Sequence, residues 1–459
     1  MSDKSITRTL AEFAASLSYD DLPAEVATRA KQLLLDITGI AVRARYDVDS
    51  TQTMLNTLRR LEQGGSTTVI GETASFSPTA AALLNGAMAH SLDFDDTHAA
   101  GSIHSSAPIV PAALAAAQMA GANGKELIAA IVAGYEVQIR LSLALVPKDH
   151  YDRGFHPTAT CGTFGAAAAA ARAMGLDADA IASAFGICGS QAAGSMQFLE
   201  DGAWNKRYHV GNAASNGVMA ATLAAEGYQG ASDPIEGKAG FLHAYAPNPD
   251  PARAIANLGD EWETLSLAVK PYPSCRYSHA ALDGVIALRN EHDIDANAIE
   301  SVEIGLPEMG WKIIGEGDKH DPQTVVDGQF SMAFCAAVAF REGRMAWDDY
   351  AKHLSNDDTK ALTRKINAVV DAQAEAEYPA QMSGVVRVRT ADGSFERFVR
   401  IPKGEPENFP SDAELRNKFD TLVAPYLAND QANALAEGLL HLEQSNNVDS
   451  LLALSVPSN

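Results

Sequence analysis

Alanine and glycine dominate the helical segments of this chain, and this restricts what it can fold into. The run GAAAAAARAMG at 165–175 carries almost no large side chains, and helical periodicity recurs from about residue 6 to residue 265. One such segment places a set of apolar residues on a single face, namely Val26, Ala30, Leu33, Leu34 and Ile37. Small side chains let helix backbones approach closely, so we expect a tightly packed helical domain.

Near residue 266 the sequence pattern changes from one typical of helices to one typical of mixed strands and helices. SVEIGLP at 301–307 alternates like a strand, and GVVRVRTADGSFERFVRI at 384–401 holds two β-rich runs joined around Asp392-Gly393, which predicts a hairpin. Helical segments lie between these strands. Ser411 and Glu414 then form the pattern of a capping box that begins a last helical section.

A chain of 459 residues is too long for one ordinary hydrophobic core. The sequence therefore predicts a mainly α fold in which a large all-helical domain is made from both chain ends, at 1–267 and 407–459. A smaller α+β domain, which we expect to act as a lid, is inserted at 268–406.

Composition narrows the class of function. The formal net charge of −23 argues against nucleic acid or an anionic membrane as partner, because both bind basic surfaces. The start of the chain lacks the apolar core of a signal peptide, and no stretch has about 18 consecutive strongly apolar residues. The four cysteines are far apart, without zinc-site spacing, which is typical of reduced thiols in a cytoplasmic protein.

Titratable residues concentrate in four polar segments, at 91–108, 153–163, 201–215 and 268–283. Each segment has an ordinary structural interpretation: an Asp cluster caps a helix, a His before Pro forms a turn, a KRYH string lies on a surface, and two prolines stiffen a linker. We expect some acids of the first segment to cap the following helix, with Asp95 and Asp96 structural.

Together the four segments fit one chemistry. Lys and Arg grouped in a strongly acidic protein predict a site for an anion with several carboxylates, and they can stabilise the negative charge that develops during a reaction. His and Lys can remove a proton beside a carboxylate, and an Asp next to a His sets its tautomer. A metal alternative uses the cluster Asp93, Asp95, Asp96, His98 and His104, but HExxH and EF-hand spacings are absent, so we predict no metal.

Four strings in these segments resemble the MmgE/PrpD family: LDFDDTH with a following His and Pro at 92–111, GFHPTATCGTFGAAAAAA at 154–171, KRYHVGNAASNG at 206–217, and VKPYPSC at 269–275. They keep the family's order and span the whole chain. The family contains dehydratases, decarboxylases and an epimerase that act on small carboxylates.

The resemblance implies a homodimer with the two-domain architecture described above, and cofactor-free chemistry on a small di- or tricarboxylate. Carried onto this chain, it implies a catalytic set of Asp93, Thr97, His104, His156, Lys206 and Lys270. Cys275 stands where the decarboxylase-like pattern KPFPAH has a histidine. From their chemistry and position we add a substrate-binding set of Arg207, Tyr272, Cys275, Arg276, Tyr277 and His279.

We therefore expect an enzyme that abstracts a proton α to a carboxylate, in which His104 and His156 are the acid/base candidates, and we favour a lyase of the dehydratase or decarboxylase type. An epimerase of an iminodisuccinate-like dicarboxylate is the alternative, with Tyr277, His279 or Lys270 as second base. A carboxylate-binding protein without catalysis and a metal-dependent hydrolase are further alternatives.

Overall fold

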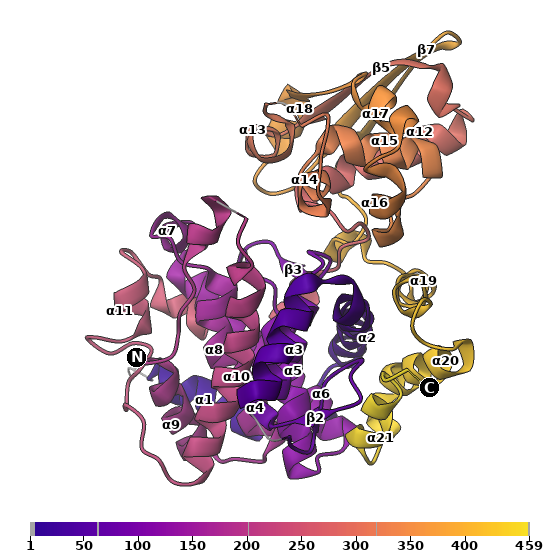
Figure 1. Ribbon diagram of the computed structural model, residues 1–459. Coiled ribbons are helices and arrows are strands. Elements are labelled where there is room, and N and C mark those ends of the chain that lie inside the picture. The colour runs from indigo at the N-terminus through magenta and orange to yellow at the C-terminus, as the bar shows by residue number, and fades with distance from the viewer. Residues whose placement is uncertain (1–4, 62–63, 201, 318, 458–459) are drawn as a thin grey trace. The chain divides into compact units, whose positions relative to one another are not determined.

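The computed structural model describes residues 5–61, 64–200, 202–317 and 319–457. Helices make up 61% of the chain and strands 9%, which confirms the predicted mainly α class. By its internal contacts the chain divides into a larger unit, residues 1–268 with 411–459, and a smaller unit, residues 269–410. Figure 1 labels the helices and some of the strands of both units.

The larger unit is helical. Its longer helices are α1 (Ile6–Ser16), α2 (Ala24–Asp47), α3 (Asp49–Leu61), α4 (Pro78–Ala89), α5 (Ser106–Ala120), α6 (Gly124–Leu145), α8 (Pro157–Ala173), α9 (Ala178–Cys188), α10 (Asn205–Ala225), α19 (Asp412–Val423) and α20 (Asn429–Leu440). Short helices include α7 (Pro147–Asp152), α11 (Phe241–Tyr245) and α21 (Val448–Ala453). Two small ladders pair β1 (Thr67–Thr68) with β2 (Ser75–Phe76), and β3 (Thr97–His98) with β4 (Leu267–Ala268).

Close backbone packing holds the centre of this unit together. Helices α4, α5, α6, α8 and α10 pack on one another, as Figure 1 shows. A Cβ added to Gly86 of α4 would lie 2.8 Å from the Cα of Gly211 in α10, and one added to Gly165 of α8 would lie 2.7 Å from the carbonyl oxygen of Gly134 in α6. The expected role of small residues in bringing helix backbones together is confirmed.

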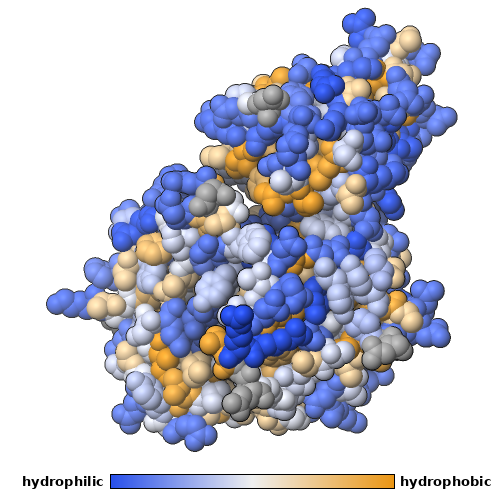
Figure 2. Space-filling model, viewed as in Figure 1, coloured by the Kyte–Doolittle hydropathy of each residue, from blue (hydrophilic) through white to orange (hydrophobic). Residues whose placement is uncertain are grey.

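Helix α6 is the one helix among the described residues that is long and apolar enough to cross a membrane. Its apolar window is wholly buried, against α5 and α8 among others, so it has the character of a core helix. In the space-filling view of Figure 2, hydrophilic residues cover most of the visible face and hydrophobic ones form separate patches.

The smaller unit contains a four-stranded sheet in the order β6-β5-β7-β8. Its strands are β5 (Ile299–Leu306), β6 (Ile366–Val370), β7 (Gly384–Thr390) and β8 (Gly393–Val399). β5 runs parallel to β6 and antiparallel to β7, and β7 and β8 form the hairpin predicted around Asp392-Gly393. The predicted strand at 301–307 corresponds to β5.

Helices of the smaller unit bury the apolar side chains of its sheet. α12 (His279–Glu291) contacts β7 and β8, and α15 (Met332–Glu342) contacts α12 and β6. The remaining helices are α13 (Glu308–Gly310), α14 (Val325–Gln329), α16 (Trp347–His353), α17 (Asp357–Thr363) and α18 (Ala372–Glu377).

The capping box predicted at the start of the last helical section is present. Ser411 caps α19: its backbone N–H donates to the Glu414 carboxylate at 2.9 Å, and the Glu414 N–H donates to the Ser411 hydroxyl at 3.4 Å. This cap returns the chain to the larger unit, where α19 packs on α2.

Candidate active site

The loop between α4 and α5 carries the first polar segment. α4 ends at Ala89, His90 forms its C-cap, and Asp93 adopts the left-handed backbone conformation with φ 52°. A non-glycine residue rarely adopts this conformation, and here it turns the chain back so that acids and histidines on both sides of the turn come together.

Asp96 supports this loop as a helix cap. Its carboxylate accepts the backbone N–H of Ser105 at 3.1 Å and that of Ser106 at 3.1 and 3.2 Å, at the start of α5. Burial and the neighbouring Asp95 raise the pKa of Asp96 to about 6. The expectation that Asp96 is structural is confirmed.

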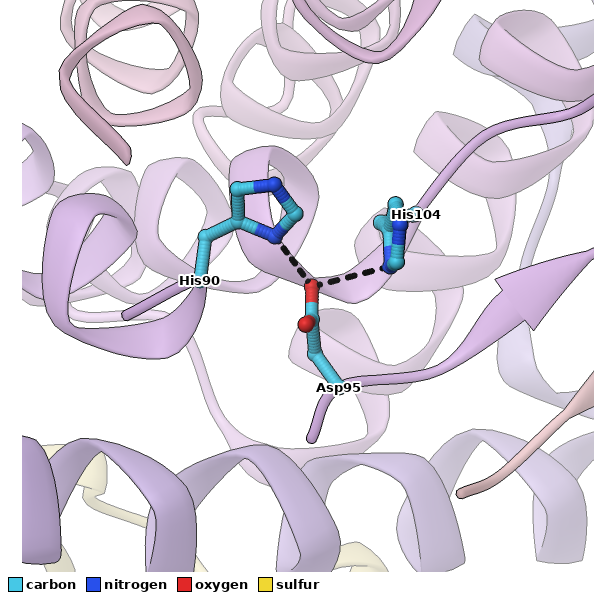
Figure 3. Close-up of side chains that lie close together, drawn as sticks. All are labelled: His90, Asp95 and His104. Atoms are coloured by element: carbon cyan, nitrogen blue, oxygen red, sulfur yellow. Dashed lines mark hydrogen bonds and ion pairs between the residues drawn. The ribbon is translucent and has the colours of Figure 1, made fainter. Parts of the chain in front are cut away.

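Asp95 lies at the centre of the loop, between two imidazoles. Its Oδ2 is 2.6 Å from Nδ1 of His90 and 3.3 Å from Nδ1 of His104 (Figure 3). The side chains of His90 and Asp95 are fully buried, and that of His104 is 16% exposed. The expectation that Asp95 is merely structural is too narrow, because its carboxylate contacts an acid/base candidate.

The charges of this cluster follow from burial and proximity. Burial lowers the pKa of His90 to about 4 in spite of Asp95, so its ring is neutral at pH 7. Burial opposes ionisation of Asp95, but His90 and His104 more than offset this and hold its pKa well below the usual range. Asp95 is therefore an ionised acceptor inside the protein.

Lys206 reaches the same loop from the first turn of α10. Its Nζ lies 2.9 Å from Oδ1 of Asp93. Burial disfavours the ammonium charge, but Asp93 and then Asp95 outweigh burial and raise the pKa of Lys206. The lysine is a fixed cation beside the buried histidines.

His156 joins the cluster from the N-terminus of α8, where it forms the N-cap. Its ring centroid is 6.0 Å from that of His90 and 6.2 Å from that of His209 in α10. Burial, with His90 and Lys206 nearby, holds the pKa of His156 well below its usual range. A neutral imidazole can accept a hydrogen bond at one ring nitrogen and donate one from the other without carrying a charge.

Thr97 and His98 form the short strand β3. Thr97 pairs with Ala268, and its buried Oγ1 has no hydrogen-bond partner among the described residues. Both ring nitrogens of His98 are used structurally, since Nδ1 accepts the Gly101 N–H at 2.9 Å and Nε2 lies 3.1 Å from Glu263. These contacts do not favour the metal alternative for His98.

Lys418 of α19 binds the backbone of the loop between α4 and α5. Its Nζ donates to the carbonyl of Phe94 at 2.9 Å, lies 2.7 Å from Oδ1 of Asp36, and sits 3.8 Å from the centroid of the Phe94 ring. Asp36 and Lys418 are both buried in the larger unit. A C-terminal helix thus fixes the backbone between Asp93 and Asp95.

Arg207 is less directly placed than Lys206. Its Nη1 donates to the Ser50 hydroxyl at 3.1 Å, and burial lowers its pKa although Asp93 acts in the opposite direction. The role predicted for Arg207 in substrate binding stays a prediction.

The twelve predicted site residues are divided between the two units. Asp93, Thr97, His104, His156, Lys206 and Arg207 lie in the larger unit, and the structure brings Asp93, His104, His156 and Lys206 around His90 and Asp95. The rest lie in the smaller unit: Lys270, Tyr272, Cys275, Arg276, Tyr277 and His279. That both groups act on one substrate is still only a prediction from the sequence.

Within the smaller unit, several of the predicted substrate-binding side chains bond to neighbours. Tyr272 donates to Asp283 at 2.6 Å. The guanidinium of Arg276 pairs with Glu405 through Nε at 2.8 Å and through Nη2, so its charge is already compensated.

Lys270, Cys275 and His279 are buried. Nε2 of His279 lies 3.3 Å from the carbonyl of Ser274, and the backbone N–H of Cys275 donates to Gln329 at 3.0 Å. Tyr277 lies 3.4 Å, oxygen to oxygen, from Tyr378, and burial raises its pKa.

Two groups of three side chains have donor atoms close enough for a metal ion, all within 4.8 Å of one another: His90, Asp95 and His104, and, in the smaller unit, Glu342, Asp349 and His353. In the second group hydrogen bonds account for each side chain: Glu342 binds Lys352 and His353, Asp349 accepts the Ala346 N–H, and His353 also bonds Thr359. In the first group both Nδ1 atoms face one carboxylate oxygen, and that of His90 is within hydrogen-bond distance of it.

His90 and Asp95 are the site residues that the sequence did not assign. Asp95 stands in the string at 92–111 and His90 just before it, and a His at a helix end followed by an acid-rich turn was the available signal. Lys418, more than three hundred positions away along the chain, left no local signal.

Comparison with known proteins decides the family. A model of the MmgE/PrpD N-terminal domain matches residues 8–254, and one of the MmgE/PrpD C-terminal domain matches residues 272–444. The chain belongs to the MmgE/PrpD family. The earlier resemblance is confirmed over nearly the whole length.

Relatives named as cis-aconitate decarboxylases or decarboxylase-like proteins are similar to this MmgE/PrpD chain, two of them from end to end. A cis-aconitate decarboxylase-like protein, oryM, of Aspergillus oryzae is 29% identical over 98% of this chain and 97% of its own length. The cis-aconitate decarboxylase of Aspergillus terreus is 27% identical over 98% of this chain and 95% of its own. That of Homo sapiens is 31% identical over 62% of this chain and 60% of its own. The protein is thus an enzyme of the MmgE/PrpD lyase type.

Proposed function

We propose that this enzyme decarboxylates cis-aconitate or a closely similar unsaturated tricarboxylate, without a cofactor. The observation that carries the proposal is the end-to-end similarity to decarboxylases together with the gathering of Asp93, His104, His156 and Lys206 in one partly buried cluster. The quoted relatives support a lyase and not the epimerase alternative.

Decarboxylation of such a substrate requires only a few functional groups of the enzyme. The bond between a carboxyl carbon and its neighbour breaks, CO₂ leaves, and the electron pair remains on the carbon skeleton until one proton replaces the lost group. The enzyme must therefore bind anions, stabilise negative charge in the transition state and deliver a proton.

The residues of the larger unit fit these tasks. Lys206 supplies a cation in a partly water-excluded place, where an electrostatic interaction is stronger than in water. His104, half-buried beside an ionised Asp95, is the acid that delivers the proton, and the neutral His156 donates a hydrogen bond to a carboxylate. Lys270, which is buried in the smaller unit, is proposed as a further cation.

The test is turnover of cis-aconitate by the purified protein in deuterated water, followed by CO₂ release and by NMR of the product. We expect one CO₂ per substrate and one deuteron on the product carbon. Deuterium exchange without CO₂ would favour the epimerase, and a hydrated product would favour a dehydratase. A protein inert toward cis-aconitate would contradict the proposal.

Matched variants tie the activity to the site. We expect His104→Asn and Lys206→Met to lose activity by about 10²-fold or more, because each removes an acid or a cation from the transition state. His441→Asn and Lys148→Met change the same residue types at exposed ion pairs and serve as controls.

We also propose that the enzyme is a homodimer. Support comes from one face of α10, where Trp204 at its N-cap and Tyr208 and Met219 within it are 47%, 47% and 43% exposed. Exposed apolar residues in a row are typical of a protein interface. Light scattering should give twice the chain mass of 48.5 kDa, and Tyr208→Glu should reduce it toward one.

A further inference from the structure

One carboxylate oxygen serves two imidazoles in this enzyme. Oδ2 of Asp95 lies 2.6 Å from Nδ1 of His90 and 3.3 Å from Nδ1 of His104, and the two rings meet edge to face with centroids 4.7 Å apart (Figure 3). Of these two histidines, the resemblance assigned a catalytic role only to His104. The contact with the shorter distance belongs to His90.

The hydrogen-bond chemistry sets the tautomer of His90. An ionised carboxylate can only accept, so the Nδ1 atom that contacts it carries the hydrogen. His90 is neutral, which leaves the lone pair on Nε2, and this atom is buried with no hydrogen-bond partner among the described residues. Among the described residues, the hydrogen bond to Asp95 is therefore the one that the ring of His90 makes.

The same chemistry applies to His104 at a longer distance. Its Nδ1 faces the same oxygen, which favours the tautomer with hydrogen on Nδ1 and the lone pair on Nε2. At 3.3 Å the contact is not an aligned hydrogen bond. A charge-assisted bond is shorter than a neutral one, so a protonated His104 would be drawn toward Asp95.

We propose that Asp95 and His90 are positioning residues for His104: Asp95 keeps hydrogen on Nδ1 of His104, so that Nε2 is the atom that takes up a proton and then delivers it, and His90 fixes Asp95 in place. This inference rests on the proposed acid/base role of His104. His90 matters because the second oxygen of Asp95, Oδ1, is buried without a hydrogen-bond partner among the described residues. Without His90 the carboxylate would have only His104 and could turn away.

The arrangement also argues against a metal ion bound by these three side chains. A metal ligand needs a lone pair on the ligating nitrogen, whereas Nδ1 of His90 lies 2.6 Å from a carboxylate oxygen, a distance typical of N–H donation. The inference thus assigns the cluster to proton chemistry.

The kinetic test compares two substitutions of His90. Asparagine can place an amide N–H near the position of Nδ1, whereas alanine cannot. We expect His90→Ala to lower kcat by about 10²-fold with KM changed less than about twofold, since a misplaced acid slows the chemical step while anion binding persists. His90→Asn should recover most of kcat. His441→Asn is the control for the residue type.

The second measurement does not need turnover. In protein labelled with ¹⁵N in its imidazoles, His104 should show hydrogen on Nδ1 in the wild type, and a mixture of tautomers in His90→Ala and Asp95→Asn. The proposed function can then fail, through an enzyme inert toward cis-aconitate, while this tautomer result still supports the positioning role.

Three results would overturn the inference. One is equal kcat for wild type, His90→Ala and His90→Asn in an active enzyme. Another is a His104 tautomer that is unchanged in Asp95→Asn. The third is one tightly bound metal ion per chain that is lost in His90→Ala, which would assign the cluster to metal binding instead.

Discussion

Lys206 and Asp93 form an ion pair that joins the first turn of α10 to the loop after α4, with 2.9 Å between Nζ and Oδ1. The pair places a compensated cation next to the neutral rings of His90 and His156. An arriving carboxylate can take over part of the bonding of Lys206 and release Asp93 to hydrogen-bond elsewhere.

The first prediction concerns this pair. We expect Asp93→Asn and Lys206→Met each to destabilise the fold slightly, with a coupling of about 1 kcal/mol in a double-mutant cycle, because both side chains retain some contact with water. Chemical unfolding of the four proteins measures it. Activity should not follow the same cycle, since Lys206→Met alone removes the cation and should abolish most turnover. Independent, additive effects on unfolding would contradict the pairing.

The second prediction concerns pH. The pKa of His90 is about 4 in the folded protein and near 6.5 in the unfolded chain, so the unfolded state binds the extra proton between these values. The free energy of unfolding should therefore fall as pH decreases from about 6.5 to 4, and Asp95, whose pKa is also lowered, adds a loss at still lower pH. Over this pH range His90 should account for a loss on the order of 2 kcal/mol in the free energy of unfolding.

Urea unfolding at several pH values tests this dependence. His90→Asn has no group that titrates in this range, so its unfolding free energy should depend less on pH than that of the wild type. The exposed His441→Asn should leave the dependence unchanged. An unaltered slope in His90→Asn would show that His90 does not carry the effect.

The third prediction concerns Lys418. Lys418→Met should reduce the free energy of unfolding by about 3 kcal/mol, because it leaves the buried Asp36 without its cation. It should also lower kcat, since the Phe94 carbonyl between Asp93 and Asp95 loses its donor. Thermal unfolding and steady-state kinetics measure the two effects separately.

A second substitution separates these effects. In Lys418→Met with Asp36→Asn the uncompensated charge is gone, so much of the stability should return while kcat stays low. Full recovery of kcat would mean that Lys418 acts only through stability and not through the loop.

The fourth prediction concerns the contact of α4 with α10. Alanine usually stabilises a helix relative to glycine, but a Cβ at position 211 would lie 2.2 Å from the carbonyl oxygen of Leu83. Gly211→Ala should therefore destabilise the protein by about 1–3 kcal/mol and shift α10, on which Lys206 stands. At Gly189 the nearest atom would be 3.6 Å away, so Gly189→Ala should be nearly neutral. Calorimetric unfolding of the two variants measures the difference.

Much of the fold could be predicted from local pattern. The Asp392-Gly393 turn, the strand near 301–307 and the Ser411–Glu414 capping box depend on residues close in sequence, and each is present. The predicted domain limits at 267/268 and 406/407 compare with changes of unit at 268/269 and 410/411. Composition and periodicity carry this information because a helix or hairpin is specified by its own residues.

The site was only partly predictable. Asp93, His104, His156 and Lys206 could be proposed because each stands in a polar string amid apolar helices. His90 and Asp95 could not, because their contact depends on the left-handed turn at Asp93, and nothing in the residue types alone requires a non-glycine residue to adopt it. Lys418 depends on how α19 packs against α2, a tertiary relationship without a local pattern.

The reach of Lys418 to the Phe94 carbonyl has a consequence for biosynthesis. The catalytic loop is translated early, yet the cation that braces it belongs to a helix made near the end of the chain. A nascent polypeptide still on the ribosome therefore lacks this support for the loop, and we expect full activity only after α19 has packed on α2.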